Sequence, residues 1–135
     1  MSGPMIYKSA PTVLADALTL TGSLVATDDV DTSLASYVTF AIDYTKGGTA
    51  LEVVFEEQLQ GDATWRPATA QSSGSPSGGA VSVELVSVTH TVTATGSRSI
   101  TLPCYGATKM RARVRETGTP SGTVTVTAVA SRVGG

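Results

Sequence analysis

Apolar and polar residues alternate with a period of two along most of this chain, as in β-strands that bury one face. The segment 37–45 shows the pattern best, because one of its faces carries Val38, Phe40, Ile42 and Tyr44. Similar segments are predicted as strands at 17–26, 50–60, 63–67, 81–95, 98–102, 105–116 and 123–133. The phase of the alternation shifts near Leu85 and Val86, which indicates a bulge or a strand that changes sheet.

Glycine-containing turn signals separate these segments, notably at 46–48, 61–62 and 118–122. About eight strands at such spacing predict an all-β fold, a single antiparallel two-sheet sandwich of Greek-key or jelly-roll type. Residues 17–135 would form this sandwich, and the proline-containing segment 1–16 an extended N-terminal arm. The Gly- and Ser-rich stretch 71–79 is predicted as an exposed loop.

Composition supports the β class. The chain holds 21 Thr, 16 Val and 15 Ser but only 3 Lys, and its charged fraction is 15%, against about 25% in ordinary domains. β-branched residues disfavour helices, so helical bundles and doubly wound α/β enzymes are excluded. No apolar run is long enough to cross a bilayer, and we expect no signal peptide. A net charge of −2 gives no general attraction to nucleic acid.

Few residues are suited to catalysis. His90 is the only histidine, and Cys104 the only cysteine, so an internal disulfide is excluded and a reducing cytosol is favoured for maturation. We expect His90 to be an ordinary strand residue and Cys104 a small buried one, unless the fold joins them as a dyad. Paired carboxylates can hydrolyse glycosides, but Glu52, Glu56 and Glu57 are expected to be solvated. The sequence therefore predicts no enzyme, no catalytic residues and no cofactor.

The acidic segment Asp28-Asp29-Val30-Asp31 is predicted as a turn. Clustered carboxylates could bind calcium, a cation that prefers several oxygen ligands. The segment lacks the glycine and the distal glutamate of the familiar 12-residue calcium loop. We therefore expect a solvated turn and no metal.

Arg111, Arg113 and Arg115 alternate with Met110, Ala112 and Val114, so the three guanidinium groups should share the outer face of one strand. They would repel one another unless paired. The candidate partners are Asp43, Glu52 and Glu56, or acidic groups of a neighbouring subunit. Nucleic acid is the less favoured partner, because no aromatic residues are interleaved with the arginines.

Trp65 and Tyr105 could form a platform for a sugar ring. A single tryptophan near a turn is more commonly part of the core or of a sheet edge. An open ring beside a groove would favour carbohydrate binding, and a buried ring would disfavour it.

The order of several segments resembles small β-sandwich virion proteins of tailed bacteriophages, over about residues 35–133. The resemblance lies in Tyr44-Thr45-Lys46-Gly47-Gly48, the strand 51–57, Gly61-Asp62-Ala63-Thr64-Trp65, and the arginine strand 109–114 followed by Gly118-Thr119-Pro120-Ser121-Gly122. The chain departs from such proteins at Leu59 to Ala63, where they often have Ser-Asp-Gly before Thr-Trp. The resemblance transfers no site residues, because surfaces do the work of this group.

The resemblance implies a non-enzymatic structural protein of the virion, assembled in the host cytoplasm. A capsid decoration or stabilising protein that acts as a homo-oligomer is the first expectation. A neck, tail or baseplate component is the alternative, and a carbohydrate- or receptor-binding module is a further one. The expected partners are other virion proteins and copies of the chain itself, with no membrane.

Overall fold

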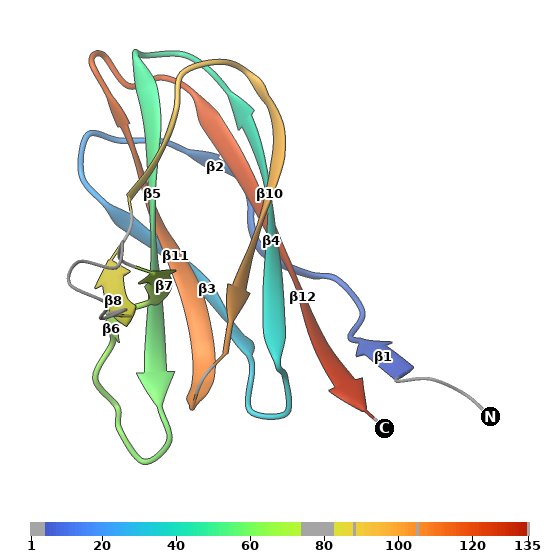
Figure 1. Ribbon diagram of the computed structural model, residues 1–135. Helices are drawn as coiled ribbons and strands as arrows, with labels where there is room; N and C mark the ends of the chain where they lie inside the picture. Colours follow the sequence, from blue (N-terminus) through green and yellow to red (C-terminus); the bar gives the residue numbers. More distant parts are fainter. Residues whose placement is uncertain (1–4, 74–82, 88, 105, 135) are drawn as a thin grey trace.

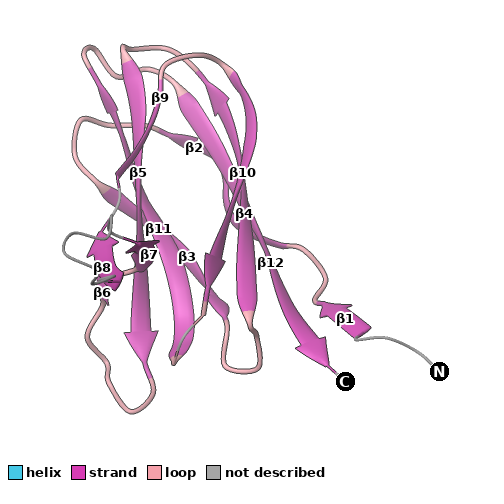
Figure 2. Cartoon of the chain, in the orientation of Figure 1, coloured by secondary structure: helices cyan, strands magenta, loops and turns pink. Residues whose placement is uncertain are grey.

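Two five-stranded antiparallel sheets face each other in the computed structural model of this protein (Figure 1). The structure describes residues 5–73, 83–87, 89–104 and 106–134. All regular elements in these ranges are strands (Figure 2), and none is a helix that could span a membrane. The predicted all-β two-sheet sandwich is confirmed.

Sheet A and sheet B are the two layers, and a small hairpin is attached to them. Sheet A consists of β1 (Met5–Lys8), β2 (Thr12–Thr19), β4 (Tyr37–Thr45), β10 (Gly96–Pro103) and β12 (Thr123–Gly134). Sheet B consists of β3 (Val25–Asp31), β5 (Ala50–Leu59), β6 (Arg66–Pro67), β9 (Thr89–Val92) and β11 (Ala107–Thr117). The hairpin is formed by β7 (Thr69–Ser73) and β8 (Val83–Ser87).

Strands that follow one another in the chain lie in different sheets over most of the fold. In sheet A the order is β2-β12-β4-β10, with β1 beside the far end of β12, and in sheet B it is β3-β11-β5-β9. Each connection from β2 to β5, and again from β9 to β12, therefore crosses between the layers. This interleaved order is that of a jelly roll.

The core lies between the two sheets and uses the alternating residues that the sequence indicates. Val38, Phe40, Ile42 and Tyr44 are all buried on β4. They face the inner residues of sheet B, and the rings of Phe40 and Phe55 lie 4.5 Å apart between the layers. The predicted inner sets of β11 and β12 are buried as well: Met110, Ala112, Val114, Val124, Val126 and Ala128.

The N-terminal segment differs from the expectation in part. Residues 5–8 and 12–16 are extended, but as strands that pair with β12. Leu14 is 3% exposed and belongs to the core. The boundary expected after residue 16 falls within β2, so this segment contributes to the sandwich.

The acidic segment predicted as a turn is part of β3, so that prediction is wrong. Thr27 and Val30 both point inward although they are three residues apart. A register shift where β3 pairs with β11 accommodates the extra residue. This bulge breaks the alternation and thereby conceals the strand in the sequence.

The described residues of the predicted segment 81–95 form two strands. β8 pairs with β7, whereas β9 pairs with β5 in sheet B. The chain thus changes sheet, which was one of the two predicted alternatives. The change was predicted near Leu85 and Val86, but β8 continues to Ser87 and β9 begins at Thr89. Of the predicted loop 71–79, residues 71–73 belong to β7 and the remainder lies outside the described residues.

Candidate functional site

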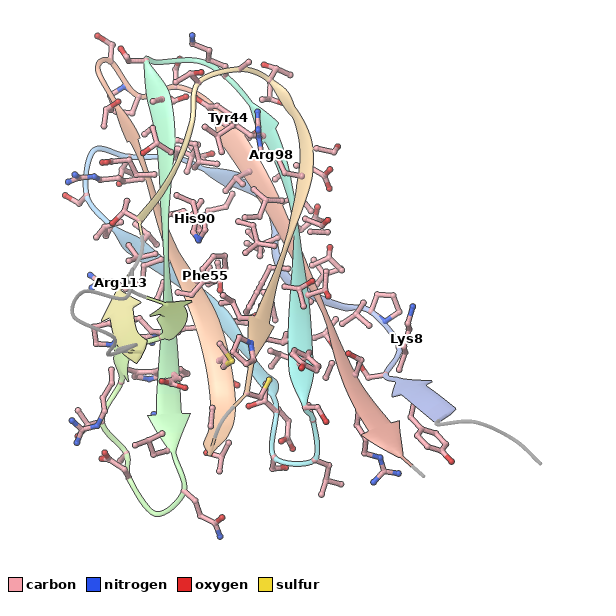
Figure 3. All side chains as sticks on the ribbon, in the orientation of Figure 1. Lys8, Tyr44, Phe55, His90, Arg98 and Arg113 are labelled. Carbon is pink, nitrogen blue, oxygen red and sulfur yellow. The ribbon has the colours of Figure 1, made fainter. Side chains whose placement is uncertain are left out.

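The three arginines of β11 point outward from sheet B and are paired with glutamates of β5. Arg111 Nε lies 2.9 Å from Glu56 Oε1, and Arg115 Nε lies 2.6 Å from Glu52 Oε1. The register between the strands places each pair directly opposite. Arg113, which is labelled in Figure 3, stands opposite Val54. Its Nη1 lies 3.8 Å from Glu56 Oε2, a looser contact. Pairing of the arginines with Glu52 and Glu56 is confirmed.

Trp65 extends this charged cluster. The guanidinium carbon of Arg111 lies 4.1 Å from the centre of the indole ring, a cation–π contact. Trp65 is half-buried and is not among the core residues. The guanidinium group of Arg111 thus covers the Trp65 ring, which the sequence left open as a sugar-binding platform or as a core or edge residue. Its proposed companion, Tyr105, lies outside the described residues.

Asp43, the third candidate partner of the arginines, lies on the other sheet. Its carboxylate accepts a hydrogen bond from the hydroxyl of Ser97, the residue opposite it on β10. Asp43 and Ser97 belong to the outer face of sheet A. Asp43, one of the candidate partners, is therefore not paired with the arginines.

The outer face of sheet A is dominated by hydroxyl groups. The registers of β10, β4 and β12 align their outward residues in rows of three, and three adjoining rows give nine positions next to the row of Pro103, Tyr37 and Ser131. We call this set the hydroxyl face: Thr39, Ala41, Asp43, Ser97, Ser99, Thr101, Thr125, Thr127 and Val129. Only Asp43 among them is charged, and the hydroxyls of Thr39 and Thr101 bond each other at 2.8 Å. The two outer faces of the sandwich thus differ in chemistry.

A buried carboxylate that the sequence reasoning missed joins the two sheets. Glu116, at the inner face of β11, has no exposed surface. It accepts hydrogen bonds from the Tyr44 hydroxyl at 2.5 Å and from the amides of Gly47, Ser121 and Gly122 at 2.8–3.0 Å. A signal was present, because Glu116 continues the inward series of Met110, Ala112 and Val114.

The ionisation of Glu116 follows from these contacts. Burial opposes the charged form, but the hydrogen bonds from Tyr44 and from the amides of Gly47, Gly48 and Gly122 outweigh it. The pKa of the carboxyl therefore lies well below its usual range. The same arrangement, with burial as the larger cause, raises the pKa of Tyr44 to about 12. Glu116 is an anion that holds two turns against β4.

The glycines around Glu116 leave no room for a side chain. A Cβ atom on Gly122 would lie 2.6 Å from Glu116 Oε2 and would also collide with the carbonyl of Thr45. A Cβ atom on Gly48 would lie 2.6 Å from the carbonyl oxygen of Thr117. The turn signals at 46–48 and 118–122 thus reflect close packing around the carboxylate.

His90 lies between the layers at the edge of sheet B, near Phe55 (Figure 3). Its ring meets that of Phe55 edge-on, with 5.5 Å between centres. Burial lowers the pKa of the imidazole. This environment favours the neutral form of the histidine and suits packing.

Cys104 follows β10 and is buried. Burial, assisted by the charge of Glu57, raises the pKa of the thiol to about 11. Glu57 itself has a pKa raised by burial. Such a thiol is a poor nucleophile near neutral pH.

The aspartates of β3 do not gather around a common point. Asp31 accepts hydrogen bonds from the amide and the hydroxyl of Ser33, which hold its pKa below the usual value. Asp29 lies opposite Arg111 across the strand pair. Within the described ranges, no three His, Cys, Asp or Glu residues are placed to hold a metal ion.

Two adjoining clefts lie where β1 meets the C-terminal end of β12. One, of about 330 Å³, lies between this strand pair and the β3–β4 loop, and its lining includes Tyr7, Leu34 and Ala130. The other, of about 400 Å³, borders the hydroxyl face at Thr39 and Val129. Trp65, His90 and Cys104 line neither cleft.

Comparisons of sequence find no matching protein family and no matching curated protein. Comparison of the fold does find similar structures. A prophage-derived protein from SPBc2, YomS, has a TM-score of 0.58 at 13% identity, covering 97% of this chain and 98% of that one.

Two further structures share the fold. One, from disulfide-linked pili that are endospore appendages of Bacillus, has a TM-score of 0.53 at 11% identity, covering 99% of this chain and 93% of that one. The other, from infectious bursal disease virus strain Gx, has a TM-score of 0.52 at 11% identity, covering 99% of this chain but 33% of that one. At such low identity the likeness establishes the fold alone.

Proposed function

We propose that this protein is a non-enzymatic structural component of a tailed-phage virion, and that it acts as a homo-oligomer on the capsid surface as a decoration or stabilising protein. The observation that carries the proposal is the hydroxyl face. Its nine positions hold one charged side chain, Asp43, which is bonded to Ser97. A neighbouring subunit can cover such a face without desolvating several charges, which is the main cost of burying polar surface.

The interactions in the rest of the described molecule would make the subunit rigid, as a structural role requires. The arginines of β11 are paired within the chain, and Glu116 ties the two sheets together. The fold is also found in a prophage protein, in a pilus protein and in a virus structure. A neck, tail or baseplate position would use the same surfaces, and the location of the protein on particles distinguishes these roles.

The proposal is tested by purifying virions of the phage that encodes the protein. Mass spectrometry should detect the chain in particles, and immunogold labelling should place it on the capsid. Label on the neck, tail or baseplate would support the alternative role. Absence of the chain from purified particles would contradict both.

A pair of variants tests the role of the hydroxyl face. Thr127→Lys places a charge in the middle row of the face, next to Ala41, and should reduce incorporation into particles at least tenfold. Thr91→Lys is the matched control, because it lies on the other sheet opposite Glu52 and should incorporate normally. Equal incorporation of both folded variants would count against the hydroxyl face as the contact surface.

A further inference from the structure

The strand β1 ends sheet A with one open edge in the described part of the chain. The Ser9 amide donates to the carbonyl of Ala130 at 2.8 Å. In an antiparallel ladder, alternate residues bond to the same neighbour. The backbone groups of Ile6 and Lys8 therefore point away from β12, toward the open edge.

Three other strands with an outer edge, β10, β3 and β2, carry features that discourage pairing with another chain. On β10, Arg98 shares the inward side of Ile42, and Pro103 ends the strand. β3 has a bulge and three aspartates. β2 has two register shifts and a positive φ of 46° at Ala17. β1 is short and holds one charge, Lys8, but its pairing with β12 is regular throughout.

The surface beside β1 carries both an exposed apolar side chain and an apolar cleft, together with charges of both signs. Two copies related by a two-fold axis could therefore complement each other there. Leu34 is 79% exposed at the rim of the 330 Å³ cleft, so an apolar side chain projects next to an apolar hollow. The rim also carries charges of both signs, on Lys8, Arg132 and Asp31. An isologous interface requires that one patch contain both members of each contact.

We propose that a second copy of this chain occupies this surface, by antiparallel pairing of β1 with β1 of the partner about a two-fold axis. The pairing that uses the open backbone groups of both Ile6 and Lys8 sets Ile6 opposite Lys8 of the second copy. The axis then passes at Tyr7, which faces its own counterpart. Leu34 of each copy lies at the cleft that the other copy covers. This inference rests on the proposed function, since it names the surface for the proposed self-association.

The register predicts which residues can be cross-linked. Tyr7 and its counterpart would form a non-hydrogen-bonded pair with Cα atoms about 4.5 Å apart, which is within the range for a disulfide. Tyr7→Cys should therefore give covalent dimers under mild oxidation. Ser9→Cys is the matched control, because Ser9 would stand four residues from its own counterpart and should remain monomeric on a non-reducing gel. The wild-type lane reports any contribution from Cys104.

A second pair of variants tests the backbone pairing. Lys8→Pro removes an amide that points away from β12, so the pairing within the chain is retained. The two-fold axis doubles the loss, and the dimer dissociation constant should rise at least about tenfold. Lys8→Ala keeps the amide and should dimerise more tightly than Lys8→Pro. Sedimentation equilibrium on the full chain measures both, and circular dichroism confirms folding.

The results separate this inference from the proposed function. A wild-type protein that is monomeric at all concentrations, equal cross-linking of Tyr7→Cys and Ser9→Cys, or equal affinity of the two Lys8 variants would each overturn the β1 interface. Detection of the chain in virions would meanwhile leave the proposed function intact. Dimers with the predicted register, formed by a protein that is absent from virions, would support the β1 interface and contradict the proposed function.

Discussion

The hydroxyl of Tyr44 on β4 donates a hydrogen bond to Oε2 of Glu116 on β11 over 2.5 Å, and so connects the two sheets through a buried carboxylate. Both side chains lie in the core, with Tyr44 3% exposed and Glu116 fully covered. A buried charge is tolerated only when donors replace its water. The Glu116 network is therefore the point at which stability should be most sensitive to small changes.

Removal of the Tyr44 hydroxyl should weaken the fold without changing its shape. Tyr44→Phe leaves the buried carboxylate with one donor fewer, at an expected cost of about 1–3 kcal/mol in the free energy of unfolding. Urea denaturation measures this cost. Tyr37→Phe, at an exposed tyrosine on the same strand, is the control and should change the midpoint little. An equal effect of both substitutions would contradict the role of the network.

Glu116 should make the protein sensitive to acid. Its pKa is depressed in the folded state, whereas in the unfolded chain it should be about 4.3. The stabilisation is therefore complete above the unfolded pKa and is lost as the pH falls toward the folded pKa, since the unfolded chain takes up the proton first.

Glu116→Gln tests this sign. The variant should be less stable at pH 7, and its urea midpoint should fall less steeply than that of the wild type between about pH 5 and pH 3. Some slope should remain, because the pKa values of Asp31 and Asp62 are also lowered. Parallel acid slopes would show that the pKa of Glu116 is the same in the folded and unfolded chains, and would contradict its lowering by the network.

The turn glycines predict a sharp contrast between two alanine substitutions. Gly122→Ala would force a Cβ atom into Glu116 and the Thr45 carbonyl, and should cost about 1–3 kcal/mol or more. Gly22→Ala has nothing within 4 Å and should be neutral or stabilise by up to about 1 kcal/mol. Thermal unfolding of both proteins measures the difference, and similar melting temperatures would refute the packing argument.

His90 offers a direct titration, because it is the only histidine. Burial lowers its pKa, so its ring protons should titrate below about pH 6.5 in NMR spectra. The neutral form stabilises the fold above the unfolded pKa, and this contribution is lost as the pH falls through the folded pKa. A midpoint at or above that of the urea-unfolded chain would contradict the observed burial.

Cys104 should react slowly while the protein is folded. With a pKa of about 11, only a small fraction of the thiol is ionised at pH 8, and burial restricts access as well. A thiol-specific chromogenic reagent should label one group rapidly in denaturant and much more slowly without it. Equal rates in both conditions would show that the thiol is exposed.

The strands with regular alternation were predictable from the sequence, and so was the shared outer face of the β11 arginines, for which Glu52 and Glu56 were among the candidate partners. Both follow from a period of two, which assigns each side chain to a face. β3 was missed because its bulge places Thr27 and Val30, three residues apart, on the same face. The alternation in the sequence cannot show such an extra residue.

The Glu116 network and the hydroxyl face escaped prediction for a different reason. Each depends on which strands are neighbours. Asp43 was grouped with Glu52 and Glu56, although the interleaved order places it on the opposite outer face, beside Ser97. Alternation assigns a residue to one side of its own strand. Long-range pairing then determines which strands are adjacent, and therefore which side chains it contacts.

The interleaved strand order also affects when the protein can fold during its synthesis. Ala17 on β2 and Thr125 on β12 are hydrogen-bonded across 108 residues of sequence, and β1 is likewise paired with β12. While the ribosome is still making the intervening strands, β1 and β2 cannot pair, because β12 has not yet been synthesised. Long-range pairing of this kind folds slowly. The edge that we propose for self-association thus comes into existence only after β12 has been made, which would prevent growing chains on one messenger from joining prematurely.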